Sequence, residues 1–146
     1  MAVNQNNIYT LQATLKSVVD DMELRAKTVL EKYAGKIPDL PTYEDVKKKS
    51  IFYATYDGLV RIQQELVDIM TRLDLVIIQM EDIRKVKLTR DLSNDFRELT
   101  NFRNWVDSVV DKFKTYRYDL IENKRVVSDR VKLLQALVYS SDSKNI

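Results

Sequence analysis

The sequence predicts an all-α protein, an elongated antiparallel bundle of three long helices with coiled-coil heptads. Three observations predict this fold. The 146 residues include only two glycines and two prolines, so few residues interrupt the backbone. Apolar residues recur at steps of three and four, which is the helical period. Charged residues make up 32% and apolar residues 45%, as in a folded chain with a polar surface. We expect one domain over residues 1–146, with helices at 6–35, 43–85 and 90–139.

The first expected helix, 6–35, carries one apolar stripe. Its members are Ile8, Leu11, Leu15, Val18, Met22, Ala26, Val29 and Tyr33. Gly35 suits the left-handed conformation that often ends a helix, and Pro38 and Pro41 prevent continuation. The sequence therefore predicts a loop after this helix.

The second expected helix, 43–85, begins at an N-cap. The Thr42 hydroxyl can accept a hydrogen bond from the backbone N–H of Asp45. Gly58 is its only weak position, costing about 1 kcal/mol relative to Ala. The main apolar stripe is Leu59, Ile62, Leu66, Ile69, Leu73, Val76, Met80 and Ile83, and a second seam is Val60, Val67, Met70 and Ile77. Two seams predict packing against more than one neighbour.

The third expected helix, 90–139, has the most regular repeat. Apolar residues recur at every seventh position: Leu92, Leu99, Val106, Phe113, Leu120, Val127 and Leu134. The companion positions are Phe96, Arg103, Val110, Arg117, Lys124, Val131 and Val138. A heptad repeat of this length implies a rod of about 70 Å. The three cations among the companions either extend their charged ends to water or fix the oligomeric state.

The expected helix lengths do not match. The third helix would extend past the first by roughly 20 residues, or about 30 Å. Its heptad stripe would be an exposed apolar strip there, which monomers rarely tolerate. We therefore expect another copy or a different protein to cover it, unless the helix kinks at 100–104 and folds back. The candidate interface residues on this helix are Arg103, Trp105, Phe113, Arg117, Lys124 and Val131.

The second and third helices carry opposite charge. Residues 58–83 hold five acidic and two basic side chains, a net charge of −3, and residues 112–132 hold seven basic and three acidic ones, a net charge of +4. This difference predicts that the two helices are antiparallel neighbours.

The composition argues against an enzyme. The chain has no histidine and no cysteine, which removes the usual nucleophile–base pairs and the usual zinc and haem ligands. No glycine-rich turn is present to bind phosphate. We expect no catalytic site, no cofactor and no metal.

An alternative is a nucleic-acid-binding accessory factor that uses residues 101–125. Aromatic side chains can stack on unpaired bases while cations hold phosphates. The residues that would form this face are Lys112, Lys114, Tyr116, Tyr118 and Arg125. Reversing the charges of Lys112 and Lys114 is then expected to abolish nucleic-acid binding and to leave assembly intact.

A second alternative comes from the segment ELVDIMTRLDLVIIQMEDIR, residues 65–84. Its Leu-Asp pair and heptad spacing resemble the second helix of BAG co-chaperone domains. That resemblance implies a three-helix bundle whose last two helices use charged residues to bind the ATPase domain of a heat-shock chaperone. The third helix expected here is longer than in that family.

The sequence favours a non-enzymatic coiled-coil subunit, a scaffold or adaptor in a larger assembly, and a virus or phage product fits this prediction equally well. The expected partners are a second copy or another protein bound through the third helix. No apolar run is long enough to span a membrane, and the first ten residues lack the pattern of a signal peptide. We therefore expect a cytoplasmic protein.

Overall fold

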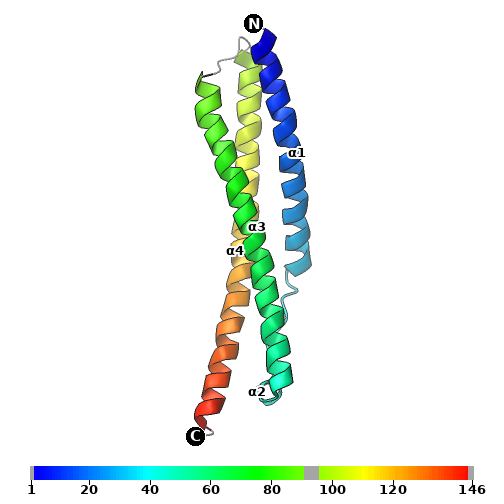
Figure 1. The fold of residues 1–146 in the computed structure, drawn as a ribbon, viewed down its shortest axis with the longest axis vertical. Coiled ribbons are helices and arrows are strands. Elements are labelled where there is room, and N and C mark those ends of the chain that lie inside the picture. Colours follow the sequence, from blue (N-terminus) through cyan, green and yellow to red (C-terminus); the bar gives the residue numbers. More distant parts are fainter. Residues whose placement is uncertain (1, 91–95, 145–146) are drawn as a thin grey trace.

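The computed structural model describes the backbone of residues 2–90 and 96–144, and the side chains of residues 10–85 and 97–137. The helices are α1 (Ala2–Tyr33), α2 (Tyr43–Val46), α3 (Lys49–Arg90) and α4 (Phe96–Lys144). Within these ranges there is no strand, so the described chain is all-α as predicted. The three long helices lie side by side along one axis, and α3 runs opposite to α1 and α4 (Figure 1).

The core between α3 and α4 is formed by the apolar stripes that the sequence predicts. Six of the eight stripe residues on α3 are buried, and Ile62 and Ile83 are half-buried. On α4 the seven-residue series is buried from Leu99, at 9% exposure, through five further members at 0% exposure, ending at Leu134. Leu92, its first member, lies outside the described residues. The predicted stripes are therefore used inside the chain.

The expected exposed strip on the last helix is absent from the described part of α4. Val127 and Leu134 lie beyond the end of α1, yet both have 0% exposure. The reason is that α3 begins at Lys49 and runs beside α4 along most of its length (Figure 1). The expectation that this stripe needs a second chain to cover it is wrong. The kink at 100–104 is also wrong, because α4 is one helix through these residues.

From Leu11 on, the first helix follows its predicted stripe with one shift, whereas Ile8 lies outside the described side chains. Val18 is 44% exposed, and Val19, at 5%, takes the core position instead. Val19 lies three residues before Met22 and four after Leu15, so it lies on the same helical face as both. After α1 ends at Tyr33, Gly35 adopts φ +65° as predicted.

The predicted single helix over 43–85 is interrupted, and the structure has a fourth, short helix. Thr42 caps α2 as expected, accepting a hydrogen bond from the Asp45 N–H at 3.3 Å. The helical path then breaks at residues 47–48, before α3 begins. In an uninterrupted helix, the seven-residue spacing continued back from Leu59 would place Asp45 in the core. The break instead buries Val46, at 5% exposure.

Candidate interaction surfaces of α3 and α4

A series of ion pairs joins α3 to α4 along one side. Arg84 Nη1 lies 2.9 Å from Asp107 Oδ1, and Lys114 Nζ lies 3.1 Å from Glu81 Oε1. Arg117 Nε donates to Asp74 Oδ1 at 2.5 Å. Lys114 and Arg117 on α4 thus meet acids of α3, which confirms the antiparallel pairing that the opposite charges predict. These side chains are 35–57% exposed, so each pair contributes at most about 1 kcal/mol.

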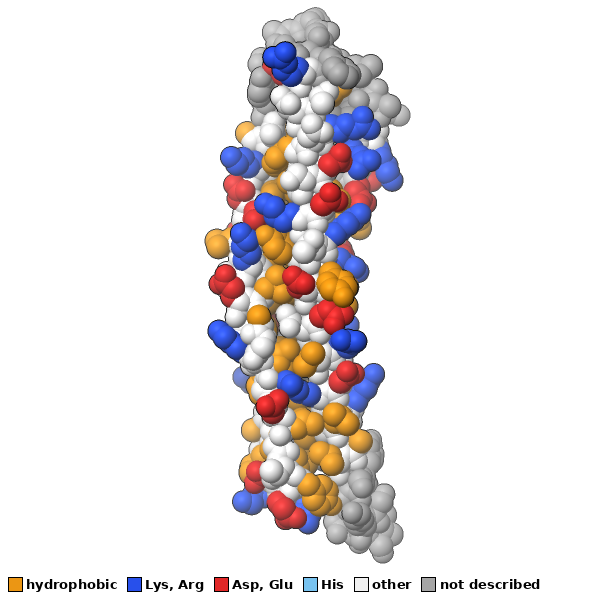
Figure 2. Space-filling model, turned by 180° about the vertical axis from the view of Figure 1, so that it is seen from behind, with side chains coloured by type: hydrophobic (Ala, Val, Ile, Leu, Met, Phe, Trp, Pro, Cys, Tyr) orange, Lys and Arg blue, Asp and Glu red, His pale blue; other side chains and the backbone are white. Residues whose placement is uncertain are grey.

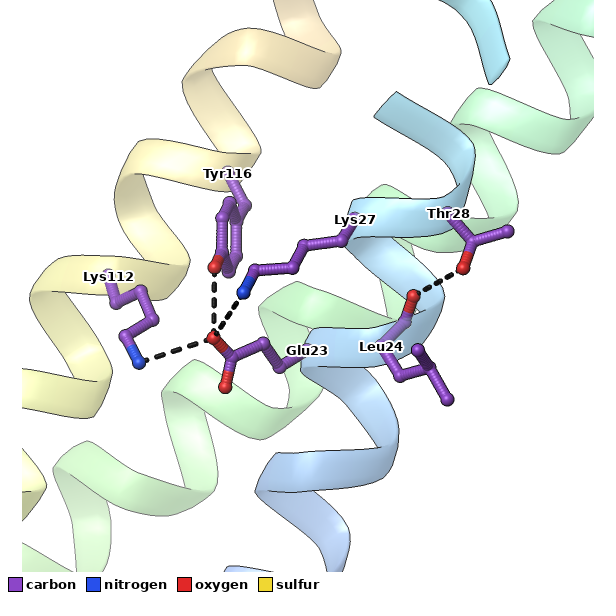
Figure 3. A network of polar contacts seen from close by, with 6 residues as sticks. All are labelled: Glu23, Leu24, Lys27, Thr28, Lys112 and Tyr116. Atoms are coloured by element: carbon purple, nitrogen blue, oxygen red, sulfur yellow. Dashed lines mark hydrogen bonds and ion pairs between the residues drawn. The ribbon is translucent and has the colours of Figure 1, made fainter. Parts of the chain in front are cut away.

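On the other side of the α3–α4 pair, Glu23 holds α1 against α4. One oxygen of its carboxylate accepts hydrogen bonds from the Lys112 ammonium at 3.2 Å and from the Tyr116 hydroxyl at 3.0 Å. Lys27 of α1 reaches the same oxygen at 3.2 Å (Figure 3). One turn further on, Thr28 donates to the carbonyl of Leu24, a bond within α1 (Figure 3).

These contacts change the protonation of Glu23 and Tyr116. Burial raises the pKa of Glu23, but the hydrogen bonds from Lys112, Lys27 and Tyr116 outweigh it, and the net pKa lies below the ordinary value of 4.5. Burial, together with the bond to Glu23, raises the pKa of Tyr116. Glu23 is therefore ionised and Tyr116 neutral at neutral pH.

A second carboxylate, Glu65, holds the end of α1 against α3. The Tyr33 hydroxyl donates a hydrogen bond to it, and Lys32 Nζ lies 3.2 Å away. Burial and the bond to Glu65 raise the pKa of Tyr33. Glu23 and Glu65 thus fix the position of α1 at two separate points.

Below the end of α1, an arginine of α4 holds the linker that follows it. The Arg130 guanidinium donates to the carbonyl oxygens of Ile37 and Pro38 at 2.7 and 2.9 Å, and to Asp39 Oδ1 at 3.2 Å. Sequence reasoning missed Arg130, Glu23 and Glu65.

The predicted interface residues differ in burial. Phe113 is fully buried in the core, at 0% exposure. Trp105, Arg117, Lys124 and Val131 are half-buried, and only Arg103 is exposed. Trp105 packs against the core, where its ring lies 6.0 Å from that of Phe102.

The residues of the predicted nucleic-acid face are divided between two sides of α4. Lys112 and Tyr116 point toward α1 and bind Glu23, whereas Lys114 lies on the opposite side and binds Glu81. Arg125 pairs with Glu122 at 2.7 Å. Tyr118 is 63% exposed. The four other residues thus contact carboxylates, and residues 101–125 do not form one continuous basic surface.

Large apolar side chains remain on the surface although the core is complete. Figure 2 shows charged side chains of both signs along the molecule and apolar ones gathered toward the lower end of that face. Among the described side chains, those that are large, apolar and at least 40% exposed are Val18, Leu24, Tyr53, Val67, Leu75, Ile78, Tyr118 and Leu133.

Other features of the described residues add no further site. No group of three or more carboxylates is placed to hold a metal ion in this part of the chain. None of the helices, as far as they are described, is long and apolar enough to cross a membrane. Comparison with protein-family models, with curated proteins and with solved structures finds no match for this chain.

Proposed function

We propose that this protein is a non-enzymatic structural subunit, a coiled-coil rod that acts as a scaffold or adaptor by associating with other chains. The observation that carries the proposal is the exposure of Leu75, Ile78 and Tyr118. They are 57%, 54% and 63% exposed on α3 and α4, two helices whose own core is already filled. Exposed apolar side chains close to one another favour a binding surface over a purely solvated one.

The geometry of the rod gives further support. α3 and α4 have 42 and 49 residues, so α4 alone extends about 73 Å. The buried seven-residue series keeps one face of α4 against α3 from Leu99 to Leu134. Two paired helices of this kind offer a long surface, which suits contact with another protein.

Solution mass tests the proposal. We expect static light scattering across a concentration series, at low and high salt, to give a mass above the 17.2 kDa of one chain. A mass that stays at one chain under all of these conditions, in the absence of other proteins, would remove the support for self-association.

The nucleic-acid alternative receives less support from the geometry, because its cations lie on different sides of α4. Lys112 is held toward α1 by Glu23, whereas Lys114 pairs with Glu81 on the opposite side. The double charge reversal of Lys112 and Lys114 is also not a clean test, contrary to the expectation above. It would break the contacts to Glu23 and Glu81 and so weaken the bundle. Binding of a fluorescent single-stranded oligonucleotide to the unchanged protein, followed against salt, tests this alternative instead.

A further inference from the structure

We propose that two copies of this chain pair through the face of α3 and α4 that lies opposite α1, with α3 of each copy against α4 of the other. This inference rests on the proposed function and names the surface and the partner. The occupant to which we commit is a second copy, because the chain carries both halves of a complementary contact.

The face is defined by what α1 leaves uncovered. α1 contacts Tyr116 and Lys112 on α4 and Glu65 on α3. On the opposite side, a shallow groove runs between α3 and α4. Its lining includes Asp74 and Glu81 of α3 and Lys114, Tyr118 and Ile121 of α4.

On α3, one border of this groove is an apolar pair between two acids. Asp68, Thr71, Leu75, Ile78 and Asp82 follow one another at steps of three and four, so they form one stripe along the helix. All five are exposed, with Leu75 at 57% and Ile78 at 54%. Thr71 and Ile78 are three and four residues from Asp74, which places the stripe beside the groove.

On α4, the other border has the opposite charge pattern. Lys114, Tyr118, Ile121 and Arg125 follow at steps of four, three and four, and form one stripe. Tyr118 is 63% exposed, Ile121 is half-buried, and the two cations at the ends are exposed. The stripe thus has a base at each end and apolar side chains between them.

The two stripes match in length and in charge. The acids of α3 are 14 residues apart, about 21 Å, and the bases of α4 are 11 residues apart, about 17 Å, a difference that Lys and Arg side chains can span. Because both ends of each stripe carry the same sign, acids meet bases whichever way the helices are aligned. Leu75 and Ile78 then face Tyr118 and Ile121.

A single chain cannot make this contact with itself, because both stripes border the same groove and face outward. Pairing of α3 with α3 of another copy would set acids against acids. A two-fold axis that sets α3 of each copy against α4 of the other instead brings acids to bases in both of the resulting contacts. The existing partners of these charges do not prevent it. Asp68–Arg72, Lys114–Glu81 and Arg125–Glu122 are exposed pairs, which exchange partners at little cost.

Complementary charge reversal tests the pairing in the full chain. One variant carries Asp68→Lys with Asp82→Lys, and the other carries Lys114→Glu with Arg125→Glu. We expect each alone to fall to the mass of a single chain in sedimentation equilibrium. An equimolar mixture should recover twice 17.2 kDa, since each stripe then meets its opposite sign. The matched control is Asp20→Lys with Glu31→Lys on exposed positions of α1, which changes the net charge as the first variant does and should associate like the wild type.

The outcomes separate this face from the proposed function. Association that persists in both variants would overturn the face and leave self-association standing, whereas a wild-type chain that never associates would overturn both. Loss of association in both variants without recovery in the mixture would overturn the pairing of α3 with α4. Circular dichroism checks that each variant is folded. If the Lys114 variant unfolds, Leu75→Ser with Ile78→Ser replaces it, because both side chains are exposed within one chain; this variant must also lose association.

Discussion

At the scale of single residues, two carboxylates make polar contacts that join α1 to the other two long helices. Glu23 accepts hydrogen bonds from Lys112 and Tyr116 of α4, and Glu65 accepts them from Lys32 and Tyr33 of α1. Neither contact follows from the periodicity of the sequence. Helical spacing says which face a residue occupies, but it does not say which residue of another helix lies opposite. That depends on where the linker and the break at 47–48 place each helix along the axis.

Replacing Glu23 by Gln should lower the free energy of unfolding by about 1 kcal/mol at pH 7, since a charged acceptor shared by three donors is lost. The pKa of Glu23 is lower in the folded chain than its ordinary 4.5. Its contribution is therefore complete above about pH 4.5 and is lost as the pH falls through the folded value. Chemical denaturation at several pH values should show the difference between wild type and variant shrinking in acid. Asp21→Asn, in an exposed pair with Arg25, is the matched control and should change stability by less than about 0.5 kcal/mol.

The two glycines should respond in opposite directions to alanine. Gly58 lies inside α3, and a Cβ atom there would meet nothing within 4 Å, so Gly58→Ala should stabilise the chain by about 0.5–1 kcal/mol. Gly35 has φ +65°, a conformation that costs an L residue roughly 1–2 kcal/mol, so Gly35→Ala should destabilise it. Thermal unfolding of both variants measures the two changes in stability. Equal shifts in the same direction would contradict the assigned backbone conformations.

At the scale of helices, the sequence predicts the long elements and their cores well, because a repeat over many turns leaves one helical face that must be buried. The seven-residue series on α4 is buried where it is described, and so is the stripe on α3 apart from the half-buried Ile62 and Ile83. The sequence predicts the short features less well. The break at 47–48 places Val46 rather than Asp45 in the core. On α1, Val19 takes the core position, although the neighbouring Val18 is equally apolar. Both are decided by tertiary packing.

Two adjacent leucines test whether the lower end of α4 is buried within one chain. Leu134 has 0% exposure and Leu133 has 57%. Leu134→Ala should cost about 2–4 kcal/mol of unfolding free energy, whereas Leu133→Ala should cost less than about 0.5 kcal/mol. Denaturation should be measured at concentrations where the protein is a single chain. Similar small effects for both variants there would mean that the end of the stripe is covered only on association.

At the scale of the whole molecule, the mismatch in helix lengths leaves the seven-residue series of α4 covered from Leu99 to Leu134. α3 runs beside α4 past the end of α1, and the linker held by Arg130 lies against α4 below that point. The sequence-based expectation of an overhang compared α4 with α1, when the neighbour that matters is α3. The surface that we propose for association is lateral, on the side opposite α1, and it does not involve the ends of the rod.

Small-angle X-ray scattering of the associated protein tests lateral pairing most directly. One chain is a rod of about 73 Å, set by the length of α4. Side-by-side pairing should leave the longest dimension near that value, apart from any stagger between the copies, while the cross-sectional radius of gyration rises with the mass. A particle of about twice the length with the cross-section of a single chain would show that the ends of the rod make the contact, and would contradict pairing through α3 and α4.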